Sequence, residues 1–157
     1  MENRHISELR LHAPLGPNFS TWVSGSGGSG TFAPNIISWD NGSNIKYWYL
    51  SFSTIGYEDL NLSSKQQSSS TGPRDFKVEW SLDGITWSDV EGSNITVASD
   101  FTSGVLYETP LPPEINNNEI VYLRWIMTSN ISVSGGTVGS SGTNRIDDIL
   151  VRGRLKT

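Results

Sequence analysis

Cysteine is absent from the 157-residue chain, and charged residues make up only 17% of it. Without cysteine the fold has no disulfides, a thiol cannot serve as a catalytic nucleophile, and a cysteine-ligated metal site is excluded. The sequence also lacks an apolar run of roughly 18 residues, the length that a membrane-spanning helix needs, so we expect no membrane insertion.

Positive charge is scarce as well. Eleven Lys and Arg residues stand against sixteen Asp and Glu residues, which gives a formal net charge of −5. The loosest basic group, residues 145–156, is interrupted by Asp147 and Asp148. Because binding to nucleic-acid phosphates depends on clustered Lys and Arg, we expect no nucleic-acid partner.

Helical periodicity is missing, since no stretch repeats apolar residues at helical spacing over three turns. Short runs rich in aromatic and β-branched residues alternate instead with Gly, Pro and Asn turn signals, a pattern typical of a β-sandwich. The sequence predicts one all-β domain over residues 1–157, an antiparallel β-sandwich of the jelly-roll type. The predicted strands are 46–53, 59–66, 75–82, 94–98, 104–109, 120–128 and 144–152.

Residue alternation separates two faces in each predicted strand, because successive side chains of a strand point to opposite sides. One face is apolar, as at Trp48, Leu50 and Phe52, and is expected in the core. The other face mixes tyrosine with hydrogen-bonding groups. Its most prominent members are Tyr47, Tyr49, Asn61, Lys65, Gln67, Lys77, Glu79, Tyr122 and Arg124.

This second face is a candidate carbohydrate site. A sugar-binding sandwich needs an aromatic ring to stack on a pyranose and planar polar side chains to reach its hydroxyl groups. An ordinary solvated sheet face is the alternative, because Tyr, Lys, Glu and Arg are common in cross-strand pairs. The predicted ligand-binding residues are Tyr47, Tyr49, Lys65, Gln67, Glu79, Tyr122, Arg124 and Trp39.

Three tryptophans lie near turns. Trp39, in the turn sequence SWDNG, offers a stacking platform for a sugar or else caps the end of the sandwich. Trp22 is open to the same two interpretations. Trp87, which follows the Asp83-Gly84 turn, is expected to be buried by packing.

Catalytic signals are weak. The two histidines, His5 and His12, lie near the N-terminus, and no serine and acid stand in an obvious arrangement with them. The acids fall mostly in turns and at strand ends, and no motif pairs two carboxylates across a cleft as a glycosidase requires. The sequence therefore predicts that the chain is not an enzyme.

A structural calcium ion is predicted at the adjacent acids Asp147 and Asp148. Carboxylate oxygens suit Ca²⁺, and two neighbouring acids repel each other unless a cation compensates them. A salt bridge to Arg145 or Arg152 is the alternative interpretation.

Several segments, taken in order, resemble a jelly-roll module of large surface and secreted proteins of Gram-positive bacteria. Such modules often accompany S-layer homology, nuclease or polysaccharide-hydrolase domains. The resemblance runs from about Trp39 to Gly153, and its final IDDI segment is similar to that of calcium-containing, carbohydrate-binding jelly rolls. The segments that carry it are residues 38–42 (SWDNG), 46–48 (KYW), 56–57 (GY), 63–66 (SSKQ), 71–78 (TGPRDFKV), 81–84 (SLDG), 122–129 (YLRWIMTS) and 142–149 (GTNRIDDI).

The sequence and this resemblance together predict a non-catalytic carbohydrate-binding module that attaches a parent protein to polysaccharide or cell-wall glycan. The resemblance implies an extracellular or cell-surface location and a larger, multidomain parent. The alternative is a structural or adhesive surface domain, which recognises protein or serves as a spacer. An exposed hydrophobic patch or long unpaired strand edges would favour that alternative.

Overall fold

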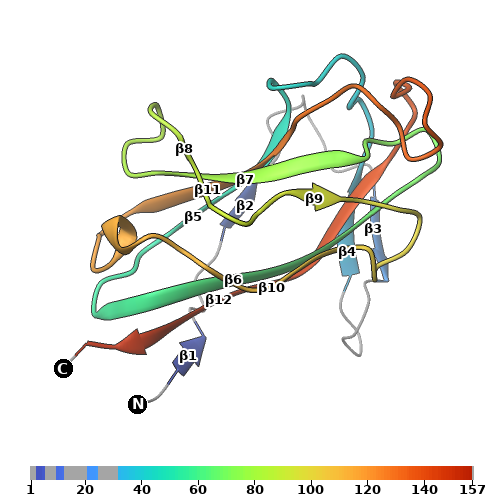
Figure 1. Cartoon of the computed structure of the whole chain (residues 1–157). Helices are drawn as coiled ribbons and strands as arrows, with labels where there is room; N and C mark the ends of the chain where they lie inside the picture. Colours follow the sequence, from blue (N-terminus) through green and yellow to red (C-terminus); the bar gives the residue numbers. More distant parts are fainter. Residues whose placement is uncertain (1–2, 6–9, 13–20, 25–31, 157) are drawn as a thin grey trace.

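The computed structural model describes the backbone of residues 3–5, 10–12, 21–24 and 32–156 and the side chains of residues 35–156. Two antiparallel, six-stranded sheets pack face to face (Figure 1). Sheet A contains, in order, β10 (Gly104–Pro110), β6 (Tyr57–Ser68), β12 (Asn144–Leu155), β4 (Phe32–Ile36) and β3 (Thr21–Ser24), and β1 (Asn3–His5) pairs with β12. Sheet B contains, in order, β2 (Arg10–His12), β5 (Tyr47–Phe52), β11 (Val121–Met127), β7 (Asp75–Ser81) and β8 (Ser88–Asp89), and β9 (Ile95–Thr96) pairs with β7.

Successive long strands alternate between the two sheets. The chain passes from β5 in sheet B to β6 in sheet A and returns to sheet B at β7. The chain alternates again over the last three strands, since β10 and β12 belong to sheet A and β11 belongs to sheet B. This connectivity confirms the predicted all-β jelly-roll sandwich. In the part of the chain that the structure describes, the one helical element is the short 3₁₀ turn η1 (Pro113–Ile115), and no helix is long and apolar enough to cross a membrane.

All seven predicted strands are present, with ends that differ by a few residues. The Asp83-Gly84 turn lies in the connection from β7 to β8, which extends over residues 82–87. The prediction missed β8 and the four short strands that precede β5. Three of these strands, β1, β2 and β8, have only two or three residues and are too short for an alternation pattern to identify them.

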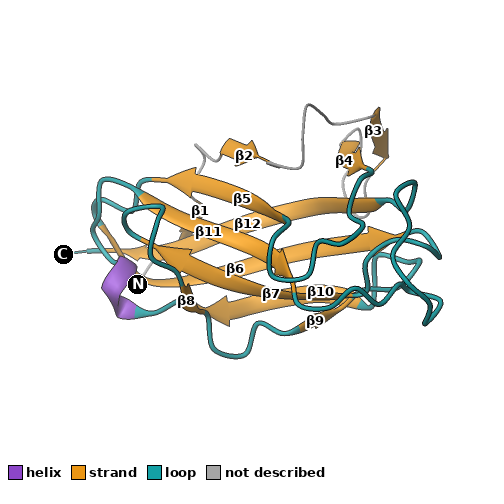
Figure 2. Cartoon of the chain, turned by 90° about the horizontal axis from the view of Figure 1, so that it is seen from above, coloured by secondary structure: helices purple, strands orange, loops and turns teal. Residues whose placement is uncertain are grey.

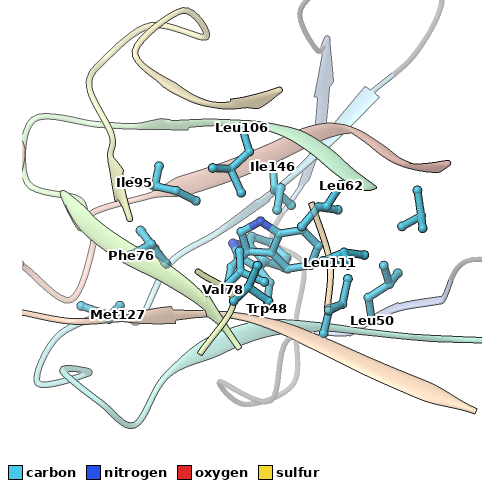
Figure 3. Close-up of a cluster of buried hydrophobic side chains, with 14 of the residues drawn as sticks. Trp48, Leu50, Leu62, Phe76, Val78, Ile95, Leu106, Leu111, Met127 and Ile146 are labelled. Carbon is cyan, nitrogen blue, oxygen red and sulfur yellow. The ribbon is translucent and has the colours of Figure 1, made fainter. Parts of the chain in front are cut away.

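The core fills the space between the two sheets (Figure 3). Trp39, Trp48, Phe76 and Trp125 are almost completely buried, and the Trp39 ring lies 5.5 Å from that of Trp48 and 5.7 Å from that of Phe76. Burial of one large aromatic side chain removes about 150–250 Å² from water, worth about 4–6 kcal/mol before side-chain entropy is subtracted. The tryptophans therefore compensate for the modest apolar content of the chain.

A buried polar network joins the two sheets through Asn144. Its Oδ1 accepts hydrogen bonds from Nε1 of Trp48 (2.8 Å) and from Nε2 of Gln66 (3.2 Å), and its Nδ2 donates to Oγ of Ser68 (2.8 Å). Trp48 belongs to sheet B, whereas the other three residues belong to sheet A. Because a buried polar group is costly unless it is hydrogen-bonded, this network favours one alignment of the sheets over others.

Candidate functional site

The outer face of sheet B carries most of the predicted site. β11 pairs with β5 on one side and with β7 on the other, so that Arg124 lies opposite Tyr49 and opposite Glu79. Asp89 of β8 extends the same row, since it lies opposite Glu79. These side chains alternate with core residues and therefore all point away from the sandwich interior.

Arg124 is the centre of this face. Its Nε and Nη2 each lie 2.8 Å from Oε1 of Glu79. Its guanidinium carbon lies 4.8 Å from the centroid of the Tyr47 ring and 4.1 Å from that of the Trp87 ring. Both distances are within the range of a cation–π contact. The ion pair and the two rings together hold the guanidinium in one position.

Four aromatic rings form a continuous chain around Arg124. The centroids are 6.1 Å apart for Tyr49 and Tyr47, 6.3 Å for Tyr47 and Trp87, and 6.4 Å for Trp87 and Tyr122. Each of the four side chains is partly exposed. We call Tyr47, Tyr49, Trp87 and Tyr122 the outer aromatic cluster. Together they provide a surface of the kind that stacks on apolar ring faces while their polar tips remain in water.

The loop between β7 and β8 places Trp87 in this cluster. Oδ1 of Asp83 accepts hydrogen bonds from the backbone N–H groups of Ile85 and Thr86, both at 2.8 Å, and from Oγ of Ser81. These bonds, led by the one from Ile85, lower the pKa of Asp83 from 3.8 to about 2. The acid thus closes the loop as an Asx turn.

Gly84 allows this loop to lie close to the ring of Tyr122. Its φ of +74° is in the left-handed region that glycine adopts most readily, and a Cβ at this position would lie 3.4 Å from Cζ of Tyr122. The expectation that packing buries Trp87 is therefore corrected, because the side chain is only partly buried. The loop folds over the outer face, and Trp87 lies against Arg124 with part of its ring exposed.

The charges of this face balance within a small network. Nζ of Lys77 lies 2.8 Å from Oδ1 of Asp89 and 3.6 Å from Oε2 of Glu79. The bond between Lys77 and Asp89 raises the pKa of the lysine and lowers the pKa of the acid. The two cations Lys77 and Arg124 therefore form ion pairs with the two anions Glu79 and Asp89. The face offers many hydrogen-bonding atoms and little net charge.

Lys65 and Gln67 lie elsewhere. Both belong to β6 of sheet A, and they point outward on the opposite side of the molecule from Tyr49 and Arg124. Lys65 Nζ lies 3.4 Å from Asp148, and Gln67 Nε2 donates to the backbone oxygen of Ser99 (3.1 Å). The expectation that these two residues share one site with the tyrosines is corrected, because β6 crosses to the other sheet.

Trp39 does not provide a stacking platform. Its side chain is completely buried, and Nε1 donates to the backbone oxygen of Ile36 at 3.0 Å. The ring packs against Trp48 and Phe76 in the core, which agrees with a packing role rather than with a stacking platform. The side chain of Trp22 lies outside the described residues.

Asp147 and Asp148 occur at a bulge in β12. The pairing of β12 with β6 shifts between Asp147 and Leu150, and Asp148 has a φ of +50°. Its carboxylate lies near Lys65, a partner that differs from the arginines considered in the sequence. Over residues 35–156 no group of three or more acids or histidines gathers as a metal site. Calcium binding at Asp147 and Asp148 stays a prediction.

Solved structures provide an independent comparison. No protein-family model matches the chain, and no curated protein matches its sequence. A CBM4 carbohydrate-binding module has a similar structure, with a TM-score of 0.53 and 15% identity over 95% of this chain and 80% of that one. So has CBM61 in complex with β-1,4-galactotriose, with a TM-score of 0.52 and 11% identity over 95% and 90% of the two chains.

The fold is that of carbohydrate-binding modules. This likeness covers nearly the whole chain, whereas the identities are too low for residue roles to carry over from one protein to another. A binding site in this protein is therefore defined by its own side chains.

Proposed function

We propose that this domain is a non-catalytic carbohydrate-binding module and that the outer aromatic cluster of sheet B is its site. One observation carries the proposal. Four partly exposed rings lie in one continuous chain around the Arg124–Glu79 pair. The likeness of the fold to two carbohydrate-binding modules supports this class of function.

In this proposal sugar recognition uses both the aromatic rings and the charged side chains of the outer face of sheet B. A ring of the cluster stacks on the apolar face of a pyranose, while the carboxylates, Lys77 and Arg124 exchange hydrogen bonds with its hydroxyl groups. The Asp83 turn and the ion pairs hold these groups in place before the ligand arrives, which lowers the entropic cost of binding. A shallow polar site must still displace bound water, so we expect dissociation constants of about micromolar to millimolar.

The pairing of charges supports a binding role rather than a catalytic one. Glycoside hydrolysis requires one carboxylic acid to protonate the leaving oxygen and a second carboxylate to act on the sugar. Both acids of this face are engaged with cations, Glu79 with Arg124 and Asp89 with Lys77. Such pairs fix the carboxylates in place to accept hydrogen bonds from sugar hydroxyl groups.

The wider role follows from the resemblance to modules of Gram-positive surface and secreted proteins. In that setting the domain holds an attached enzyme, or the cell itself, against polysaccharide or cell-wall glycan. We therefore propose an extracellular or cell-surface location and a multidomain parent.

Retention on insoluble polysaccharides tests this proposal. We expect the wild-type domain to be retained on at least one glycan, and Trp87→Ala and Tyr49→Ala to lose most of that retention. Tyr107→Ala is the matched control, because Tyr107 is a 77% exposed tyrosine on β10 of the opposite sheet. Equal loss in all three variants, or full retention in the first two, contradicts the proposed site. Melting curves of each variant exclude unfolding as the cause.

A protein-binding role is the second candidate. In the β7–β8 loop Leu82 is 40% exposed and Ile85 is 83% exposed, and exposed apolar side chains close together favour contact with a protein surface. Failure to bind any glycan by a folded domain would favour this role. Leu82→Ser with Ile85→Ser would then abolish attachment to the partner without affecting the melting temperature.

A further inference from the structure

A cleft of about 570 Å³ opens at the edge of the sandwich, between β8 and the segment that follows β10. η1 and β8 lie at the same end of the molecule in two views (Figures 1 and 2). The volume is within the range of roughly 300–1,000 Å³ that small-ligand sites occupy. The cleft is lined by Trp80, Ser88, Asp89, Glu91, Pro110, Leu111, Pro112, Pro113 and Glu114.

One part of the cleft is apolar and aromatic. Trp80 alternates with Glu79 on β7 and therefore belongs to the inner face, where it packs against the core while its ring stays partly exposed. Its indole N–H forms no hydrogen bond with any residue that the structure describes. Three prolines contribute apolar surface with fixed backbone angles, so this surface is preformed. An aromatic ring beside preformed apolar surface suits the face of a sugar ring.

The other part of the cleft is acidic. Asp89, Glu91 and Glu114 line it, whereas no Lys or Arg does. Lys77 neutralises Asp89, but Glu91 and Glu114 form no ion pair within the described part of the chain. Carboxylates accept strong hydrogen bonds from hydroxyl and ammonium groups and repel other carboxylates. The ligand that this charge distribution complements is therefore one without acidic groups.

We propose that this cleft is a second glycan subsite, specific for sugars without acidic groups. Trp80 stacks on one ring, and Glu91 and Glu114 accept hydrogen bonds from its hydroxyl or amino substituents. The inference rests on the proposed carbohydrate-binding function but concerns a different place. Trp80 is on the inner face of sheet B, whereas Trp87 lies over its outer face. A glycan bound at both places would be held at two points, which increases avidity.

NMR on the ¹⁵N-labelled chain tests the cleft, because the indole N–H signals of Trp80 and Trp87 report separately on the two places. The probes are β-1,4-galactotriose, a trisaccharide of glucosamine, and trigalacturonic acid. We expect the Trp80 signal to shift with the neutral or the amino trisaccharide and not with the acidic one. Glu91→Gln with Glu114→Gln should weaken that response about fivefold to tenfold. Glu119→Gln, an exposed glutamate outside the cleft, is the control and should leave it unchanged.

The outcomes separate this inference from the proposed function. Shifts confined to Trp87 overturn the cleft and leave the outer aromatic cluster as the site. Shifts confined to Trp80 support the cleft and contradict the outer site. A Trp80 response to trigalacturonic acid as strong as to the other probes overturns the charge selection and with it the inference. No response of either signal to any probe counts against both.

Discussion

The guanidinium carbon of Arg124 lies 4.1 Å from the centroid of the Trp87 ring. Arg124 belongs to a central strand of sheet B, whereas Trp87 is the last residue of the loop between β7 and β8. Their contact attaches the loop to the sheet face and completes the outer aromatic cluster. The stability of the loop and the integrity of the candidate site therefore depend on the same contact.

Replacement of Arg124 by alanine should destabilise the protein. Glu79 is only 9% exposed, so the change leaves a nearly buried carboxylate without its closest cation and removes the contact with two rings. We expect the free energy of unfolding to fall by about 1–3 kcal/mol, measured by urea denaturation. Arg152→Ala is the control, since Arg152 is exposed on β12. Equal stability of the two variants would show that the Arg124–Glu79 pair adds nothing net.

Asp83 should titrate with a pKa of about 2, which carboxyl NMR can measure directly. Its folded-state pKa is below its ordinary value of 3.8, so the stabilisation that it provides is fully present above about pH 4 and is lost as the pH falls through about 2. The Trp87 indole signal should keep its position down to about pH 3 and shift below that, with a midpoint near pH 2. In Asp83→Asn this pH-dependent shift should disappear. A carboxyl group that titrates near 4 would contradict the Asx turn.

The buried network around Asn144 should be more important for stability than any exposed asparagine. Asn144→Ala removes the oxygen that accepts from Trp48 and Gln66 and the amide that donates to Ser68. We expect a loss of at least about 2 kcal/mol in the free energy of unfolding. Asn94→Ala, at an exposed position, should change it by less than about 0.5 kcal/mol. Similar losses in both variants would mean that the network does not stabilise the packing of the sheets.

A structural calcium ion at Asp147 and Asp148 predicts that chelation lowers the melting temperature, because an ion that binds only the folded state stabilises it. The measurement is a melting curve in calcium and in EDTA. A bound ion at 100 times its dissociation constant would stabilise the fold by about 2.7 kcal/mol. A clear fall in melting temperature with EDTA would therefore support the calcium prediction that was made from the sequence.

Alternation along the strands predicted correctly which side chains face inward. Trp48, Leu50 and Leu62 are buried, whereas Tyr49 and Lys65 point outward, as expected. This success has a simple cause. A strand has a side-chain period of two, so one face must be apolar wherever the strand covers a core. The jelly-roll class followed from the same pattern together with the turn residues.

The alternation pattern does not show to which of the two sheets a strand belongs. A side-chain period of two separates inner from outer residues, and this period is the same in sheet A and sheet B. Tyr49 and Lys65 are both outward, yet β5 and β6 belong to different sheets, and the two residues lie on opposite sides of the molecule. Similarly, Trp39 and Trp87 are both tryptophans near turns. Only the tertiary structure buries the first between the sheets and places the second over Arg124.

The sequence by itself thus indicated seven of the strands, their inner and outer faces and the class of fold, since side-chain alternation and turn residues are local features of the chain. The tertiary structure decided which outer residues meet, because the crossovers between sheets and the path of the β7–β8 loop bring together residues that are far apart in sequence. The outer aromatic cluster and the cleft beside Trp80 are both consequences of those long-range connections.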